Sequence, residues 1–166
     1  MNNTHTTTII FSKIGRYSLA IVLLLSGISK CFYLHGFSTE VSQYCEFYIS
    51  SLLVPFSSHI AIVVCSIEVL LGLLLFFERY ILFSTFTVFT LMLFFLCLTG
   101  ENYFFPTILG RIESCGCFGE LIHFSAKGSF IKTLILCAIS FTTFCLVISY
   151  QRKTDINKRR KLRNGK

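Results

Sequence analysis

The residues best suited to chemistry are Cys115 and Cys117, which stand one residue apart in the string Cys-Gly-Cys-Phe-Gly. Two thiols this close can form a disulfide or pass one on to another protein. Such a pair reaches disulfide geometry only through a distorted turn, which Gly116 permits. A strained, exposed disulfide is more oxidising than a structural one. The spacing therefore favours thiol–disulfide exchange over a static cross-link.

Two other interpretations of this cysteine pair stay open. With His123, the pair offers two thiolates and an imidazole, a ligand set that Cu(I) or zinc accepts. A structural zinc site normally has four ligands at wider cysteine spacing, so Cys45 or Cys31 would have to complete it. Three ligands are too few to assign a metal site. The second alternative is a non-enzymatic accessory or scaffold subunit in which the two cysteines only brace a loop.

The elements that must position these cysteines are membrane spans. Hydrophobic residues make up 54% of the 166 residues and charged residues 14%, which leaves too little polar surface for a water-soluble domain. A helix crosses a bilayer with about 20 apolar residues. Four runs qualify, at residues 14–32, 60–77, 81–98 and 130–150. The sequence predicts an all-α membrane protein, a four-transmembrane-helix bundle formed by one domain over residues 1–150.

The positions of lysine and arginine predict the orientation. Short cytoplasmic segments retain positive charge, and residues 151–166 carry eight basic residues against one aspartate, whereas residues 33–59 carry none. Four spans then place both termini in the cytoplasm and residues 99–128 in the bacterial periplasm, where disulfides persist. We expect all residues outside the four spans to form loops or terminal tails. The basic tail, residues 151–166, lacks the aromatic residues of a nucleic-acid site, so we interpret it as a topological anchor.

The first run also has an alternative interpretation. Basic residues, an apolar stretch and then small residues are typical of a signal peptide, and its removal would leave three spans. The apolar run continues past the small residues to Phe32, which favours a permanent first span.

Further thiols are expected near the outer face. Cys31 and Cys97 end the first and third spans, and Cys45 lies in the first outer loop. An exchange reaction needs a resolving cysteine to complete the transfer. Cys45 is the candidate, because a loop residue can move. Three cysteines inside the spans are expected to pack as small buried apolar side chains: Cys65, Cys137 and Cys145.

Two charged residues in the predicted spans stand out. Glu68 lies roughly 12 Å inside the second span at the helical rise, whereas Lys30 is shallow enough to extend to the lipid headgroups. A direct pair would require the lysine to reach inward. In a functional interpretation, Lys30 favours a thiolate at the cysteine pair and Glu68 moves its proton. In a structural one, the two residues set the helix register, while Gly27 and Gly72 allow the helices to approach closely.

The order of these residues resembles a known family. Ser26-Gly27-x-x-Lys30, then Glu68, then Cys-Gly-Cys-Phe-Gly before the last span is similar to the MauE branch of the DoxX-like membrane proteins, named for methylamine utilisation. The resemblance covers about residues 14–150. It implies an inner-membrane protein that helps to mature a periplasmic partner, with a thioredoxin-like companion. In the family's own pathway that partner is the methylamine dehydrogenase small subunit. By this likeness Cys115 and Cys117 are the redox pair.

A looser resemblance concerns the electron acceptor. Four helices with outer cysteines resemble vitamin K epoxide reductase, although the Cys-x-x-Cys string of that family is missing here. The likeness implies a thiol–disulfide oxidoreductase with a quinone as candidate cofactor. Phe94, Phe95 and Phe141 could line a quinone pocket, but phenylalanines that face lipid need no such explanation.

Overall fold

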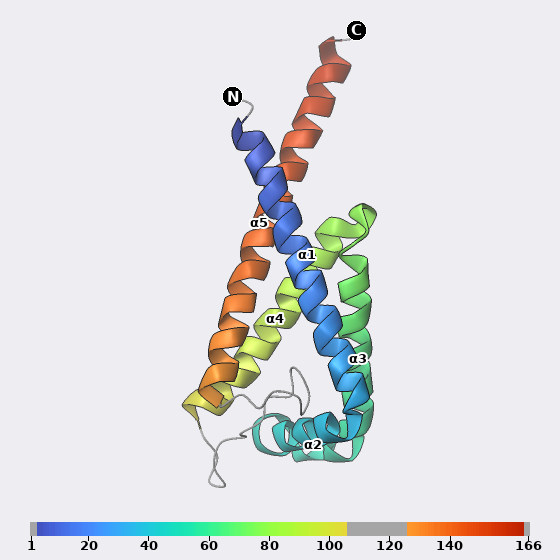
Figure 1. Ribbon diagram of the computed structural model, residues 1–166, viewed down its shortest axis with the longest axis vertical. Coiled ribbons are helices and arrows are strands. Elements are labelled where there is room, and N and C mark those ends of the chain that lie inside the picture. Colours follow the sequence, from blue (N-terminus) through green and yellow to red (C-terminus); the bar gives the residue numbers. More distant parts are fainter. Residues whose placement is uncertain (1–2, 106–125, 165–166) are drawn as a thin grey trace.

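The computed structural model describes residues 3–105 and 126–164, and no strand occurs among them (Figure 1). Its helices are α1 (Asn3–Phe32), α2 (Leu34–Tyr44), η1 (Cys45–Ile49), η2 (Ser51–Phe56), α3 (Ser57–Leu74), η3 (Glu78–Tyr80), α4 (Ile81–Phe104) and α5 (Ala126–Asn164). Four segments are long and apolar enough to cross a membrane: Ile10–Phe32, Ser51–Leu74, Glu78–Phe104 and Lys127–Arg152. The predicted all-α membrane bundle with four spans is confirmed.

The four long helices run along the bundle, and α2 lies across one end of it (Figure 1). The N-terminal end of α1 and the C-terminal end of α5 lie together at the opposite end. The C-terminal end of α4 and the N-terminal end of α5 lie at the α2 end. The segment that contains the Cys-Gly-Cys string therefore leaves and rejoins the bundle at the α2 end.

The expectation of a loop over residues 33–59 is wrong, because most of this segment is helical. Leu34, Phe37 and Val41 recur at helical spacing, so they share one face of α2. This face packs on the start of α3, where Phe37 forms a buried cluster with Ala61 and Cys65. The segment is too short to span a membrane, and its helix is stabilised by this contact with α3.

The helix of the fourth span does not end where the basic tail begins, at residue 151. Helix α5 continues to Asn164, beyond the last apolar residues of the fourth span. Residues 151–164 contain neither proline nor glycine and are rich in lysine and arginine, which are good helix formers. Nothing in this sequence stops the helix where the membrane span ends.

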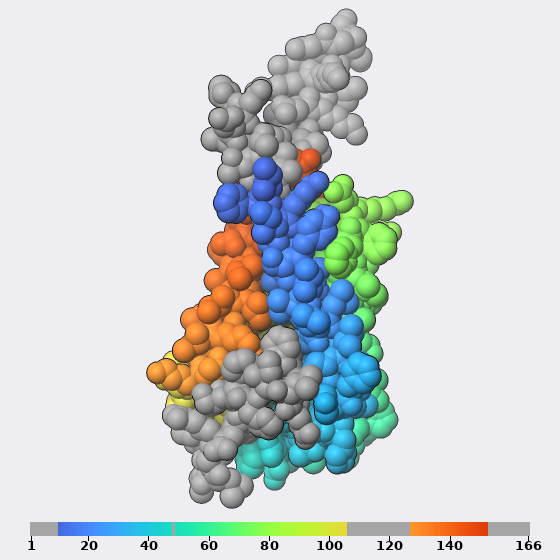
Figure 2. Space-filling view, viewed as in Figure 1, coloured from blue at the N-terminus to red at the C-terminus, as the bar shows by residue number. Residues whose placement is uncertain are grey.

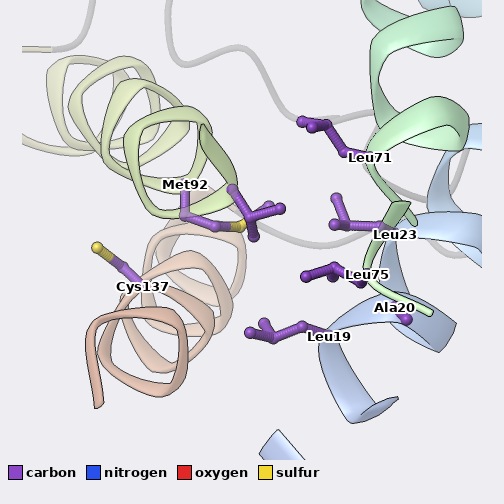
Figure 3. Close-up of a cluster of buried hydrophobic side chains, with 8 residues drawn as sticks. Leu19, Ala20, Leu23, Leu71, Leu75, Met92 and Cys137 are labelled. Carbon is purple, nitrogen blue, oxygen red and sulfur yellow. The ribbon is translucent and has the colours of Figure 1, made fainter. Parts of the chain in front are cut away.

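The core lies between the four spans (Figure 3). Leu19, Leu23 and Leu71 belong to a buried cluster toward which Met92 projects from α4. Cys137 of α5 lies at the edge of the same cluster. On the face seen in Figure 2, α1 lies between α5 and α3. Helix α1 therefore contributes to packing with both of its neighbours.

The predicted close approach of α1 and α3 is confirmed. A Cβ atom added to Gly27 would lie 2.7 Å from Cγ2 of Val69 and 3.3 Å from the carbonyl oxygen of Cys65. A Cβ atom on Gly72 would lie 2.8 Å from Cγ of Leu24. Both glycines are therefore required for the observed separation of the two helices.

At the other end of the bundle, a short turn joins the second and third spans. It contains η3, whose Glu78 lies 3.8 Å from Lys13 Nζ and 3.9 Å from an Arg16 guanidinium nitrogen. Arg16 is buried and donates a hydrogen bond to the Tyr17 hydroxyl at 3.1 Å. This basic residue thus links α1 to the turn as well as contributing to the charge of the N-terminal region.

Candidate functional site

The site is centred on an ion pair between α1 and α3. Lys30 Nζ contacts Glu68 Oε1, and both residues are only 1% exposed. Ser26 Oγ donates a hydrogen bond of 3.2 Å to Glu68 Oε2. Ser26 and Lys30 are four residues apart and so lie on one face of α1. The expectation that Lys30 extends to the headgroups is wrong, because close packing of α1 on α3 places Glu68 within its reach.

Two aromatic rings complete the surroundings of the lysine. The Lys30 ammonium lies 4.9 Å from the centre of the Phe37 ring and 5.1 Å from that of Phe95. The negative faces of aromatic rings attract cations, most strongly where water is excluded. Helices α2 and α4 thus supply one ring each, and four helices meet around one ammonium group.

A cavity of about 370 Å³ opens beside the lysine. Lys30, Tyr44 and Cys45 line it together with Phe94 and Phe95. Small-molecule sites in proteins are mostly apolar cavities of about 300–1,000 Å³ with a few polar groups. Of the three phenylalanines considered for a pocket, Phe94 and Phe95 line this cavity, and Phe94 is also half exposed. Phe141 lies elsewhere, half exposed and packed on Phe89 with ring centres 5.5 Å apart.

Cys45 does not lie in a loop as expected. It is the first residue of the π-helical turn η1 and is 1% exposed. Burial raises the pKa of the Cys45 thiol, because a thiolate loses its hydration there. Cys45 can therefore act as a resolving thiol only when η1 moves or when a reacting disulfide enters the cavity.

The main predicted pair is not among the residues that the structure describes. Cys115, Cys117 and the alternative ligand His123 all lie in the segment 106–125. Among the side chains that the structure describes, no three from His, Cys, Asp or Glu come close enough together to hold a metal ion.

The remaining cysteines form contacts that the spacing in sequence did not reveal. Cys31 is exposed near the end of α1, and its thiol lies near that of Cys65 on α3. Cys65 and Cys137 are buried as expected, whereas Cys145 is exposed, so the expectation of burial is wrong for Cys145. Exposed Cys97 lies within electrostatic range of Cys137.

One charged residue near the site was missed in the sequence analysis. Lys132 lies two residues inside the fourth apolar run, as close to its end as Lys30 is to the end of the first run, and a lysine within a span is itself a signal. It lines a small cavity of about 30 Å³ together with Ser26, Glu68 and Thr133. Lys132 of α5 is thus a second basic residue, besides Lys30 of α1, near the Glu68 carboxylate.

The fold and this site define a multi-pass helical membrane protein, embedded in a lipid bilayer, whose spans converge on a buried lysine–glutamate pair. The family model described as "Methylamine utilisation protein MauE" matches residues 8–150. The chain therefore belongs to the MauE family, and the resemblance drawn from its motifs is confirmed. No curated protein and no solved structure matches it.

Proposed function

We propose that this MauE-family protein is a thiol–disulfide oxidoreductase of the bacterial inner membrane that supports the maturation of a periplasmic protein. Cys115 and Cys117 exchange disulfides with that substrate or with a thioredoxin-like companion. The observation that carries the proposal is the buried Lys30–Glu68 pair, whose lysine lies in the last turn of α1, just before α2. The segment that carries the two cysteines joins α4 to α5, whose ends lie at the same end of the bundle, and this supports a role for the pair in the chemistry of those cysteines.

The proposed reaction transfers two electrons. A thiolate of the partner attacks one sulfur of the Cys115–Cys117 disulfide and releases the other as a thiolate. A second partner thiol then attacks the mixed disulfide, so that the partner gains a disulfide and the pair is left reduced. Lys30 stabilises the released thiolate, Glu68 supplies or takes up its proton, and Cys45 serves as an alternative resolving thiol.

Regeneration of the pair needs an electron acceptor, for which the 370 Å³ cavity is the candidate site. Its phenylalanine rings and the Lys30 ammonium fit a quinone, whose ring is apolar and whose carbonyl oxygens accept hydrogen bonds. A bound quinone would accept two electrons and two protons. The residues of this chain would bind the ring, direct its carbonyl toward Lys30 and keep water away.

The proposed organisation is a single transmembrane domain over residues 1–150 with a basic cytoplasmic tail over residues 151–166. Both termini are cytoplasmic and the Cys115/Cys117 segment is periplasmic. The excess of lysine and arginine in the tail supports this orientation.

The experiment that tests the function is the capture of a mixed disulfide. Cys115→Ser and Cys117→Ser each leave one thiol of the pair without its resolving partner. At least one of the two variants should retain a covalent partner on a non-reducing gel, and dithiothreitol should release it. Cys145→Ser is the matched control, because Cys145 is exposed on α5 and the chain keeps its cysteine pair. If neither variant retains a partner, the protein is an accessory or scaffold subunit.

A further inference from the structure

The contact between Cys31 and Cys65 joins two helices at the charged centre of the bundle. The two thiols come from α1 and α3 and lie near each other, next to the point where Gly27 packs against the backbone of Cys65. Lys30 and Glu68 both lie within electrostatic range of Cys65. We propose that Cys31 and Cys65 are a second redox-active dithiol, which closes to a disulfide between α1 and α3 beside the Lys30–Glu68 pair. This proposal does not depend on exchange at Cys115 and Cys117.

The helix geometry holds the two thiols together. Gly27 packs against the backbone of Cys65, where an added Cβ atom would lie 3.3 Å from the carbonyl oxygen. Cys31 lies four residues after Gly27 and therefore on the same face of α1. A disulfide needs Cα atoms about 4.4–6.8 Å apart, which two helices reach only where a small residue lets their backbones approach. The register of α1 on α3 supplies that condition.

The two thiols differ in access. Cys31 is exposed and is the last residue but one of α1, near the end of the span. Cys65 is 1% exposed and packs with Phe37 and Ala61. A disulfide reagent therefore meets Cys31 first, and Cys65 is placed to resolve the product. An exposed attacking thiol beside a protected resolving thiol is the arrangement that exchange requires.

The ion pair can accept the proton that the buried Cys65 thiol must lose before it reacts. Creating a new charge in an apolar interior is costly. Glu68 lies three residues from Cys65, so both side chains share one face of α3. When the Cys65 proton moves to the Glu68 carboxylate, the negative charge moves from oxygen to sulfur and stays near the Lys30 ammonium. The number of charges in the interior is then unchanged.

The complete reaction consumes one external disulfide. The Cys31 thiolate attacks it, forms a mixed disulfide and releases the first thiol of the reagent. The Cys65 thiolate then attacks Cys31 Sγ, forms the Cys31–Cys65 bond and releases the second thiol. The two cysteines lose two electrons, which reduce the external disulfide. Their two protons pass to the two leaving thiols, the second of them by way of Glu68.

The chain contains a matched comparison pair. Cys97 on α4 and Cys137 on α5 are also an exposed and a buried thiol within electrostatic range of each other. Lys30 and Glu68 act electrostatically on the Cys65 thiol. Among the described residues, Cys97 is the group that acts on the Cys137 thiol. A difference in reactivity between the two pairs therefore reports on the ion pair.

The test uses full-length chains in native membranes. One variant keeps only Cys31 and Cys65, a second keeps only Cys97 and Cys137, and alanine replaces every other cysteine. Both are treated with the membrane-permeant disulfide 4,4′-dithiodipyridine. The first variant should release two thiopyridones per chain and yield a peptide linked through Cys31 and Cys65 in mass spectrometry. It should close about tenfold faster or more than the second variant.

Two results would overturn the proposal. Release of one thiopyridone with a stable adduct on Cys31 would mean that Cys65 does not resolve it. Equal closure rates in both variants would mean that the ion pair has no part. If the substituted chains fail to accumulate, the linked peptide is measured in the otherwise unaltered chain, where its absence after treatment counts equally against the proposal. Both variants lack Cys115 and Cys117, so their results are independent of the function proposed above.

The role of the ion pair has its own test in the chain that keeps only Cys31 and Cys65. The double substitution Lys30→Met/Glu68→Gln removes both charges together and leaves none unpaired. The second thiopyridone should appear about tenfold more slowly near neutral pH, and the difference should disappear at high pH, where hydroxide removes the proton. Closure of the Cys97/Cys137 chain should not change with the same substitutions. A rate ratio that is the same at every pH would show that the pair acts only through structure.

Discussion

At the scale of single residues, the Lys30–Glu68 pair dominates the energetics of the interior. Both side chains are almost fully buried, and the positive charge of Lys30 neutralises the negative charge of Glu68. The Ser26 hydroxyl and the Phe37 and Phe95 rings provide further favourable contacts. Removing one partner leaves an uncompensated charge in a region of low dielectric, whereas removing both leaves a polar but neutral site.

This asymmetry leads to a prediction about stability. Lys30→Met or Glu68→Gln alone should destabilise the protein by about 3–5 kcal/mol, while the double substitution should recover most of that loss. Thermal unfolding in detergent, followed by the fraction that remains monodisperse, measures the effect. Lys13→Met is the control, because its pair with Glu78 has side chains that are 54% and 71% exposed and should contribute little. Equal losses in the single and double variants would contradict the buried-pair interpretation.

At the scale of helices, the site depends on how closely α1 and α3 pack and on the short helix α2. The close approach at Gly27 brings Lys30 opposite Glu68 and Cys31 opposite Cys65. Helix α2 then covers this region with Phe37 and Tyr44. Helices α1 and α3 could not form the site without α2 and α4, because Lys30 of α1 contacts Glu68 of α3, and its other partners are aromatic rings on α2 and α4.

A glycine substitution tests this dependence. Gly27→Leu should push α1 away from α3, since even a Cβ atom would lie 2.7 Å from Val69 and 3.2 Å from its backbone nitrogen. We expect lower thermal stability and loss of the disulfide between Cys31 and Cys65, measured by the yield of the linked peptide. Gly100→Ala is the matched control, because its added Cβ would meet only Phe130, at an ordinary 3.5 Å. Retention of both properties in Gly27→Leu would show that the close approach is not needed.

At the scale of the whole molecule, the bundle has two different ends. One end carries α2, the start of α5 and the end of α4, and the other carries the start of α1, the turn at η3 and the end of α5 (Figure 1). The basic residues of the tail lie in the part of the chain that leaves from the second end. If the positive-inside rule holds, the first end faces the periplasm.

Reporter fusions test this orientation. Green fluorescent protein fused after Lys166 should fluoresce, and alkaline phosphatase fused there should be inactive, because the proposed orientation places that end in the cytoplasm. Alkaline phosphatase inserted after Ser50 or Phe105 should be active. Active phosphatase after Lys166 would place Cys115 and Cys117 in the reducing cytoplasm and would remove the basis of the proposed exchange.

The four spans, the family and the two charged residues of the site could all be inferred from the amino-acid sequence. Membrane insertion depends on the hydropathy of consecutive residues, which is local information, and the spacing of Ser26, Gly27 and Lys30 is local as well. Three features could be seen only in the tertiary structure. Lys30 points inward and contacts Glu68, Cys31 lies near Cys65, and α2 packs over this region. These contacts depend on the rotation and depth of one helix against another, which small packing differences between distant residues set. A hydropathy pattern carries no information about that register.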